Sequence, residues 1–478
     1  MVLRTPGSGN PAPLCYNPGF GEKSRVYQEP QLRRSIPAFV LLAVISTVLG
    51  SCSVGTNNNS GGTPTPTTSG LNNRVFVSNA CVPSGLGGCS GFGALNMIDA
   101  NNDNLTQNSI GVGPQPGLMA VSALNAGHRA TTLVFNTGDN SISVISNSAE
   151  IAVPGSPIKL RGATESMAVS PDGLKGYAAV PGALPIGGTD TGLVVVMNLA
   201  TPSVTAELAI PQARFLALSP DGTKLLVLSD QVDTVTLINT ADNSTAATFT
   251  SPDGVDRPVA ALFTSDGSTA YILNCGAECG GGTATVAVLN MAGPSITTTI
   301  NVDAAHVGLI DTAKKQLYVA GNSNGGKLDV LNINTPDSPS VTLGLGSSPF
   351  VPAVTISDGV HTLMALGSNN KLFIGARNSA SSNCVLSGCL TFFDTNTNTT
   401  SVDNPIDSIT DAFKGEVTGM QPLLSRGLVY VVEGNVSGGP NVSSGELRVF
   451  DTASNPPSEI PGRIDIRGQA VDVKAVDQ

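Results

Sequence analysis

A turn motif that recurs at a nearly constant spacing limits the possible folds of this chain more than any other feature. Residues 170–173 read Ser-Pro-Asp-Gly, residues 219–222 repeat this motif, and residues 264–267 read Thr-Ser-Asp-Gly. Each copy lies between two short apolar runs, which is the pattern of a β-hairpin. A third run that ends in Asn, as at 193–198 and 234–239, and a fourth run, as at 246–251, follow the hairpin. The sequence therefore predicts repeated units of four short antiparallel strands, A to D.

The second strand of each unit, strand B, serves as a marker and gives eight units. The markers begin at Arg74, Thr131, Lys175, Lys224, Thr269, Gln316, Lys371 and Leu428. A repeat of roughly 40–50 residues with four strands is typical of a β-propeller. We therefore expect an all-β fold, a single propeller over residues 71–478 with four-stranded antiparallel blades. Eight blades of about 51 residues fit the markers, and seven remain open if unit seven or eight is a decorated loop.

The two ends of the repeat region predict how the ring closes. Unit one starts at its strand B, at Arg74, with no strand A before it. The chain ends with residues 468–475, which look like a strand A with nothing after it. We expect this C-terminal strand to complete the first blade, because doing so would cover two sheet edges that otherwise invite aggregation.

The repeat resembles the YVTN-type propeller repeat of the lactonase-like propeller superfamily. The best match is residues 216–243, LALSPDGTKLLVLSDQVDTVTLINTADN. The resemblance covers about residues 71–478, strongly in the central units and weakly in units one, seven and eight. It implies the propeller fold, and it raises an enzymatic alternative, a lactonase-like hydrolase with a metal ion at one mouth of the central channel.

The first seventy residues have the features of an export signal followed by a linker. Arg33 and Arg34 precede an apolar run, 36–49, that is too short to span a membrane but fits a signal-peptide core. Leu-Gly-Ser-Cys at 49–52 resembles the bacterial lipobox, which implies cleavage before Cys52 and lipidation of its thiol. Residues 1–51 would then be an N-terminal extension and signal peptide. Residues 52–70 would form a flexible tether, because 53–70 carry no charge and are rich in Gly, Asn, Thr, Ser and Pro.

These features predict a lipid-anchored protein of the cell envelope, periplasmic or on the cell surface. Ser53 after the lipidated Cys favours the outer membrane. An uncleaved anchor and an ordinary signal peptide are the alternatives. We expect contact with the membrane through the lipid anchor only, and a monomer.

Composition excludes several functions. The net charge is −11, with 24 Lys and Arg against 35 Asp and Glu, so we expect no nucleic-acid partner. The absence of Trp argues against quinone-dependent dehydrogenase propellers, and the absence of Cys-x-x-Cys-His argues against c-type haem. The sequence also lacks a His-Glu-x-x-His motif and a P-loop.

Six cysteines of the exported part fall in three close pairs. The pairs are Cys81/Cys89, Cys275/Cys279 and Cys384/Cys389, each placed between the B and C strands of a unit. Such pairs in an exported chain indicate local disulfides that stiffen the B–C loops. Metal binding is the alternative for Cys275 and Cys279, which are four residues apart, but no His accompanies them in the sequence. In a propeller the B–C loops share a face with the D–A loops.

One set of polar residues could line a mouth of the channel. With the units aligned on strand B, the set lies at or within two residues of one register just before strand A: Glu165, Arg214, Arg257, His306, His361 and Glu416. His and Glu together could hold a metal ion or transfer protons. D–A loops are commonly polar, however, so these side chains could equally be solvated loop residues. The remaining His, His128, falls in the expected A–B hairpin 123–130 of unit two.

Taken together, the sequence favours a non-catalytic binding or scaffold module at the cell envelope. Its partner would be a protein or a polysaccharide held by the stiffened loops, and we expect no cofactor. In the alternative, the lactonase-like hydrolase, the candidate catalytic residues are Glu165, His306, His361 and Glu416, with a metal ion as cofactor.

Overall fold

The computed structural model of the chain describes residues 68–80, 93–184, 191–322, 325–333, 341–343, 354–377, 388–402, 416–436, 444–462, 464–466 and 468–477. These residues belong to one compact unit, Pro66–Gln478. The predicted signal peptide, Cys52 and most of the predicted tether lie outside them. The described residues form strands and short 3₁₀ turns only, and none of their helical turns has the length and apolarity needed to cross a membrane.

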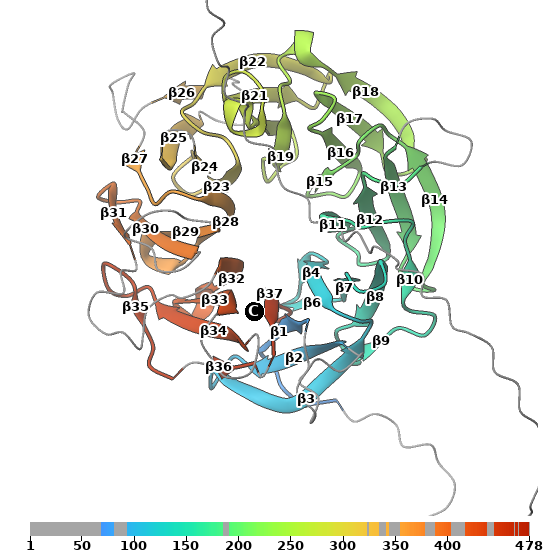
Figure 1. Ribbon diagram of the computed structural model, residues 1–478, viewed down its shortest axis with the longest axis vertical. Coiled ribbons are helices and arrows are strands. Elements are labelled where there is room, and N and C mark those ends of the chain that lie inside the picture. The colour runs from blue at the N-terminus through green and yellow to red at the C-terminus, as the bar shows by residue number, and fades with distance from the viewer. Residues whose placement is uncertain are drawn as a thin grey trace, which may run out of the picture. The chain divides into compact units, whose positions relative to one another are not determined.

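Eight antiparallel sheets surround a central channel in the described residues (Figure 1). Each sheet is one blade, and its strands run in chain order from the centre outward, except in the first blade. The first four blades are β37 (Ala470–Ala475), β1 (Arg74–Asn79), β2 (Gly93–Asp99) and β3 (Asn104–Val112); β4 (Pro116–Val121), β7 (Thr131–Asn136), β8 (Ser141–Ser146), β9 (Ile151–Ala152) and β10 (Ile158–Lys159); β11 (Ser166–Val169), β12 (Lys175–Val180), β13 (Leu193–Asn198) and β14 (Ser203–Ala209); β15 (Phe215–Leu218), β16 (Lys224–Ser229), β17 (Thr234–Asn239) and β18 (Ser244–Phe249).

The other four blades follow the same plan. They are β19 (Pro258–Phe263), β20 (Thr269–Asn274), β21 (Thr285–Asn290) and β22 (Ser295–Asn301); β23 (Val307–Asp311), β24 (Gln316–Gly321), β25 (Lys327–Ile333), β26 (Val341–Leu343) and β27 (Val354–Thr355); β28 (Val360–Leu366), β29 (Lys371–Arg377), β30 (Gly388–Asp394) and β31 (Thr399–Val402); β32 (Glu416–Leu423), β33 (Leu428–Val436), β34 (Ser444–Asp451), β35 (Ser458–Glu459) and β36 (Ile464–Asp465). A small hairpin, β5 (Leu124–Asn125) and β6 (His128–Arg129), joins β4 to β7. The 3₁₀ turns are η1 (Ser251–Asp253), η2 (Gly276–Cys279), η3 (Ser368–Asn370) and η5 (Leu424–Arg426).

The prediction of an all-β propeller with eight blades is confirmed, and the seven-blade alternative is wrong. Each predicted strand B is a strand of the structure that starts at the predicted residue. These strands are recognisable because they are buried on both sides. In β16, for example, Leu225–Leu228 are all fully buried, between β15 and β17 within the sheet and between the neighbouring blades above and below it. The predicted strand D at 246–251 lies two residues too late, since β18 is Ser244–Phe249.

The Ser-Pro-Asp-Gly motif makes the A–B turn through its own side chains. In blade four, Ser219 Oγ donates to Asp221 Oδ1 (2.5 Å) and accepts from the backbone N–H of Lys224 (2.9 Å). Asp221 Oδ1 also accepts from the N–H of Thr223 (3.0 Å). These hydrogen bonds lower the pKa of Asp221, the bond from Ser219 most of all. Gly222 completes the turn with φ +73°, a left-handed conformation that favours glycine.

Substituting Gly222 by Ala is expected to destabilise the ring more than the same change at Gly267. The two glycines have nearly the same φ, +73° and +71°, so the backbone strain of about 1–2 kcal/mol should be equal. A Cβ at Gly222 would lie 2.5 Å from Pro171 Cδ in the turn of the preceding blade, whereas at Gly267 the nearest atom is 3.7 Å away. We expect Gly222→Ala to cost at least about 1 kcal/mol more in chemical denaturation. Equal losses of stability for the two variants would contradict a steric clash between a Cβ at position 222 and Pro171.

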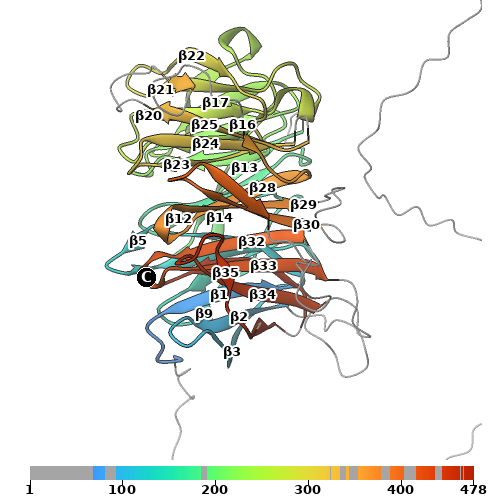
Figure 2. The same cartoon turned by 90° about the vertical axis from the view of Figure 1, so that its left-hand side faces the viewer.

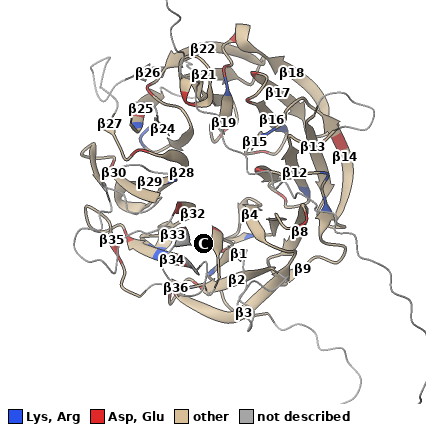
Figure 3. Cartoon of the chain, in the orientation of Figure 1, with Lys and Arg blue, Asp and Glu red and all other residues tan. Residues whose placement is uncertain are grey.

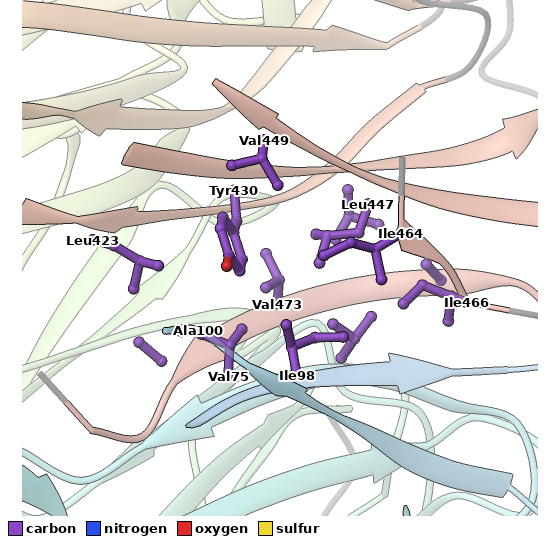
Figure 4. Close-up of a cluster of buried hydrophobic side chains, with 14 of the residues drawn as sticks. Val75, Ile98, Ala100, Leu423, Tyr430, Leu447, Val449, Ile464, Ile466 and Val473 are labelled. Carbon is purple, nitrogen blue, oxygen red and sulfur yellow. The ribbon is translucent and has the colours of Figure 1, made fainter. Parts of the chain in front are cut away.

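The ring closes as predicted, with the C-terminal strand inside the first blade. Strand β37 pairs antiparallel with β1, with Val77 opposite Val473 and Val75 opposite Ala475 (Figure 1). A buried cluster joins this blade to the last one (Figure 4), with Val75, Ile98 and Val473 on one side and Tyr430, Leu447, Val449 and Ile464 on the other. Figure 2 shows the C-terminus and β5 on the same side of the ring. This is the side of the A–B turns.

An ion-pair cluster with little exposure reinforces the closure. Arg74, the first residue of β1, donates from Nε to Asp477 Oδ2 (2.6 Å) and from Nη2 to Asp477 Oδ1 (2.9 Å). Its Nη1 donates to Glu150 Oε1 (2.9 Å) of blade two. His128 Nδ1 lies 2.9 Å from Asp477 Oδ1, so the third His contacts the closure even though most of its ring is exposed. The closure thus ties blade two to the C-terminus.

Candidate functional site

The residues expected at one register before strand A do occupy corresponding positions in their blades. Glu165, Arg214, Arg257 and His306 directly precede β11, β15, β19 and β23. Glu416 is the first residue of β32, and His361 is the second residue of β28. Strand A starts on the face that also carries the B–C connections, so this part of the prediction is confirmed by the topology. Whether these residues are functional stays a prediction.

A cavity of about 560 Å³ occupies the channel and receives side chains from all eight blades. Its lining includes four threonines and several ionisable groups, namely Thr137, Thr164, Thr362, Thr418, Glu165, His306, Arg377, Asp472 and Lys474. Because each blade contributes through its inner strand or the residues beside it, closing the ring builds the cavity. Figure 3 shows acidic and basic residues scattered around the ring. The described lining carries both signs, with Glu165 and Asp472 against Arg377 and Lys474.

Arg377 presents hydrogen-bond donors in this channel. It ends β29, and its Nε donates to the carbonyl of Val417 (3.1 Å), which fixes the guanidinium. Burial lowers the pKa of Arg377, while the carboxylates of Glu416 and Asp472 act in the opposite direction. An arginine remains charged even so. Among the described residues, no partner accepts a hydrogen bond from its Nη1 or Nη2 groups.

The two other ionisable groups on β37 that line the channel are bound to each other. Lys474 Nζ donates to Asp472 Oδ1 (2.8 Å), and Asp472 Oδ2 accepts from the N–H of Met119 (2.9 Å). The carboxylate of Asp472 is therefore held by its own strand and by the next blade. Arg377 is left as the cation of the described channel lining whose terminal nitrogens can receive a ligand.

Glu165 is bound to Arg214 and does not form a shared site with His306 and His361. Arg214 Nε donates to Glu165 Oε2 (3.0 Å), and Arg214 Nη1 donates to Asp230 Oδ2 (2.9 Å). The two carboxylates raise the pKa of Arg214 although its burial opposes this. Arg257 is held likewise, with its N–H on Asp233 Oδ1 (2.9 Å) and its Nη1 on the carbonyl of Asp230 (3.1 Å). This side of the mouth is an ion-pair network between blades three, four and five.

His361 is fully buried, which corrects the expectation that its side chain rings the channel mouth. The sequence alignment assumed equal hairpin lengths. In the structure a β-bulge falls between His361 and Leu363, so Thr362 and Leu363 line the channel in its place. Burial lowers the pKa of His361 to about 4, while the charge of Glu278 acts in the opposite direction. Neither ring nitrogen has a partner in hydrogen-bonding geometry.

A cluster of metal-binding side chain types lies between blades five and six. Cys275, Glu278 and Cys279 belong to the B–C connection of blade five, at η2, and His306 precedes the inner strand of blade six. The two cysteines are joined through their Sγ atoms as a disulfide in the structure. His306 Nδ1 lies 3.7 Å from Cys275 Sγ and 3.3 Å from Glu278 Oε1. The sequence showed no His beside this pair, because His306 is brought there by the packing of two blades.

The other two cysteine pairs are only partly described. Cys81, Cys89 and Cys384 lie outside the described residues, and Cys389 is the second residue of β30 rather than part of the B–C loop. Cys275 and Cys279 do lie between the B and C strands, β20 and β21, as expected.

Two functional candidates, Glu278 and Arg377, were missed at the sequence level. Glu278 stands between the two cysteines, and this position could have marked it. Arg377 carries no such signal, since its place in the channel depends on where β29 ends.

A larger cavity of about 910 Å³ lies on the opposite face, beside the ring closure. Arg74, His128 and Glu150 line it, but all three are bound in the closure cluster. This cavity is therefore best explained as a consequence of how the ring closes.

No protein-family model matches the chain, and no curated protein matches it in sequence. Solved structures do match. The chain is similar to the dihydro-heme d1 dehydrogenase NirN in complex with DHE, with 11% identity, 85% of this chain and 75% of that chain covered, and a TM-score of 0.54. It also matches a putative 6-phosphogluconolactonase from Bacteroides fragilis NCTC 9343 (11% identity, 86% and 100% covered, TM-score 0.49) and a periplasmic gluconolactonase from Pseudomonas aeruginosa (13%, 76% and 98%, TM-score 0.45). At such low identity the likeness to NirN shows the propeller fold alone.

Proposed function

We propose that this chain is a non-catalytic binding module of the cell envelope, and that an acidic group of its ligand enters the central channel. One observation carries the proposal. A cavity built by all eight blades holds a fixed guanidinium, Arg377, whose terminal nitrogens have no described partner. A guanidinium so placed suits a carboxylate, which it can bind through two parallel hydrogen bonds.

The ligand class that fits this lining best is a polysaccharide that carries uronic acids. Four threonines share the cavity lining with Arg377. The hydroxyls of Thr137 and Thr164 already donate to backbone carbonyls, so we expect them to act as acceptors toward sugar hydroxyls. A protein that inserts an acidic side chain is the other envelope partner of the same chemistry. We expect the chain to act as a monomer, with no nucleic-acid partner and no cofactor for binding.

The test is a binding titration with a uronic-acid oligosaccharide, with a neutral oligosaccharide of equal length as the comparison. Replacing Arg377 by Met is expected to weaken uronate binding about 10- to 100-fold, the worth of a charged hydrogen bond of roughly 1.5–3 kcal/mol. Arg161→Met is the matched control, because Arg161 pairs with Glu207 on the outer part of blade three. Failure of the uronate to bind, or equal binding by Arg377→Met, would overturn the proposal. Capture of an envelope protein by the parent chain but not by Arg377→Met would replace the polysaccharide with a protein.

The lactonase-like hydrolase gains no stronger support from the geometry. It needs a metal ion or an acid–base pair among Glu165, His306, His361 and Glu416. Among the described residues these four do not bring three ligand atoms together, Glu165 is bound to Arg214, and His361 is enclosed in a sheet. The candidate residues therefore do not fit the metal centre that the resemblance implied, and we derive no hydrolytic step.

The envelope location is likewise a proposal, supported by the lipobox-like residues 49–52 and the uncharged tether. Replacing Cys52 by Ala should move the protein from the membrane fraction to the soluble fraction of the envelope, because the only expected contact with lipid is lost. Mass spectrometry of the parent protein should find the lipid on Cys52. An unmodified Cys52, or a variant that stays in the membrane fraction, would refute the anchor. The three disulfides proposed from the sequence are tested by counting free thiols in the purified protein.

A further inference from the structure

The B–C connection of blade five brings four potential metal ligands to the edge of blade six. The ligand atoms of Cys275, Cys279 and His306 lie within 4.8 Å of one another, and Glu278 Oε1 is 3.3 Å from the same imidazole nitrogen. We propose that Cys275, Cys279, Glu278 and His306 form a redox-controlled binding site for a zinc ion. This proposal goes beyond the binding function proposed above: Arg377 takes no part in it, and the two sites share only His306, which also lines the channel cavity.

The types of ligand and the spacing of the two cysteines fit zinc. Two thiolates, one imidazole and one carboxylate form a four-ligand set of the kind that zinc accepts in tetrahedral sites. Tetrahedral zinc, with Zn–S distances of about 2.3 Å, holds two sulfurs roughly 3.8 Å apart. The Cα atoms of Cys275 and Cys279 are 5.6 Å apart, so separating the sulfurs by this amount requires side-chain rotation rather than a backbone rearrangement.

One atom of the cluster has a polar requirement that the protein leaves unmet. Glu278 Oε1 is buried and has no hydrogen-bond partner in the structure, since the contact with His306 lies outside hydrogen-bonding geometry. Burial of a carboxylate oxygen that receives no hydrogen bond is costly, and here its one charged neighbour is the imidazole of His306 at 3.3 Å. A cation between this oxygen, the imidazole and the sulfurs would satisfy it.

The ligands are held by the neighbouring blade, as in a preorganised site. Glu278 Oε2 accepts a hydrogen bond from the backbone N–H of Asn322 (2.8 Å), just after β24. The backbone N–H of His306 donates to the carbonyl of Ala320 (2.8 Å). Between these two residues, Gly321 leaves room for the carboxylate, because a Cβ there would lie 2.7 Å from Glu278 Oε2. The end of β24 thus holds the carboxylate of Glu278 and the backbone of His306 beside the cysteine pair.

The sulfur–sulfur bond makes the site depend on redox state. With the bond closed, neither sulfur is a thiolate, and the thiolate is the form that binds metal. An external dithiol can open it: the dithiol supplies two electrons and two protons and becomes a disulfide, while Cys275 and Cys279 become thiols. Zinc then binds with loss of both thiol protons and without changing its own oxidation state. Metal occupancy would therefore report reducing conditions.

The experiment measures zinc affinity of the folded chain, residues 53–478, in both redox states. The protein is treated with excess dithiothreitol, freed of it under nitrogen, and titrated with Zn²⁺ against a chromophoric chelator. A parallel titration with Co²⁺ detects thiolate ligation through a charge-transfer band. We expect one Zn²⁺ per reduced chain, affinity at least about 100-fold weaker in the oxidised chain, and a thiolate–cobalt band in the reduced chain only.

Variants assign the ligands. Cys275→Ser and His306→Ala should each weaken binding about 10- to 100-fold or more, and Glu278→Gln should do so while preserving shape. His128→Ala and the double variant Cys384→Ser/Cys389→Ser are the controls and should bind like the parent. Thermal unfolding of each variant before titration confirms a folded ring. Equal affinity in the two redox states, loss of zinc only in the Cys384→Ser/Cys389→Ser variant, or unchanged binding by both Glu278→Gln and His306→Ala would overturn the proposal.

Discussion

Deletion of residues 469–478 is expected to abolish the cooperative unfolding of the ring or to lower its Tm by about 10 °C or more. The deletion removes β37, whose Val473 and Ala475 are fully buried, together with Val476 just after it. Burial of two valines alone contributes about 3–6 kcal/mol, and the strand also supplies the inner ladder of hydrogen bonds in the first blade. A loss of this size is comparable to the whole stability of many domains. The exposed edge of β1 should also promote association, which light scattering would detect.

Deletion of residue 478 alone is the matched control. It leaves β37 and Asp477 in place and should unfold like the full chain. A chain that lacks residues 469–478 but remains monomeric, with an unchanged Tm, would contradict the closure of the ring by its C-terminal strand.

Replacement of Arg74 by Met should cost about 3–5 kcal/mol in the free energy of unfolding. The guanidinium is the partner of two carboxylates with almost no exposure, Asp477 and Glu150, with 1% and 8% of their side-chain surface exposed. Without it the two carboxylates stay buried, with only His128 beside Asp477 and only the hydrogen bonds from Ser69 on Glu150, and removing one partner is the expensive way to break an ion pair. Lys159→Met removes a mostly exposed partner of Asp139 and should cost no more than about 1 kcal/mol. Equal losses in the two variants would show that the closure cluster contributes no more than a surface ion pair.

The pH dependence of the free energy of unfolding tests the same cluster independently. Burial opposes ionisation of Asp477, but hydrogen bonds from Arg74 and His128 outweigh it and lower the pKa of Asp477. For Glu150 the bonds from Ser69 and Arg74 likewise outweigh burial and lower its pKa. A carboxylate with a lowered pKa stabilises the fold above its ordinary pKa of about 4, and this contribution is lost as the pH falls below that value. The difference between Arg74→Met and the parent should therefore shrink below about pH 4.

The fold could be predicted from the sequence to the extent that its strands are buried on both faces. Strands such as β16 and β12 are largely apolar runs bounded by turn residues, so their first and last residues can be predicted from the sequence. The outer strands pack on one side only. In β18 four of six residues are exposed, the apolar signal is weak, and the predicted limits moved by two residues.

The site could be predicted only as a set of positions along the chain. The start of each strand A could be predicted from the sequence, and Glu165, Arg214 and His306 lie where expected. The contacts were not, because they join residues of different blades: His306 meets Cys275 across a blade boundary, and Arg377 meets the channel through the end of its strand. The bulge in β28, which buries His361, has no sequence mark such as a glycine. Local chemistry is readable from one unit, whereas a site shared by several units depends on their packing.

The most direct test of the proposed ligand site is protection of Arg377 from an arginine reagent. Residues 53–478 are treated with phenylglyoxal, with and without a saturating uronic-acid oligosaccharide, and the modification of each arginine is followed by peptide mass spectrometry. The proposal predicts that the oligosaccharide slows modification of Arg377 several-fold and leaves Arg161 on the outer part of blade three unaffected. Bound oligosaccharide with an unchanged rate at Arg377 would contradict the channel as the site where the ligand enters.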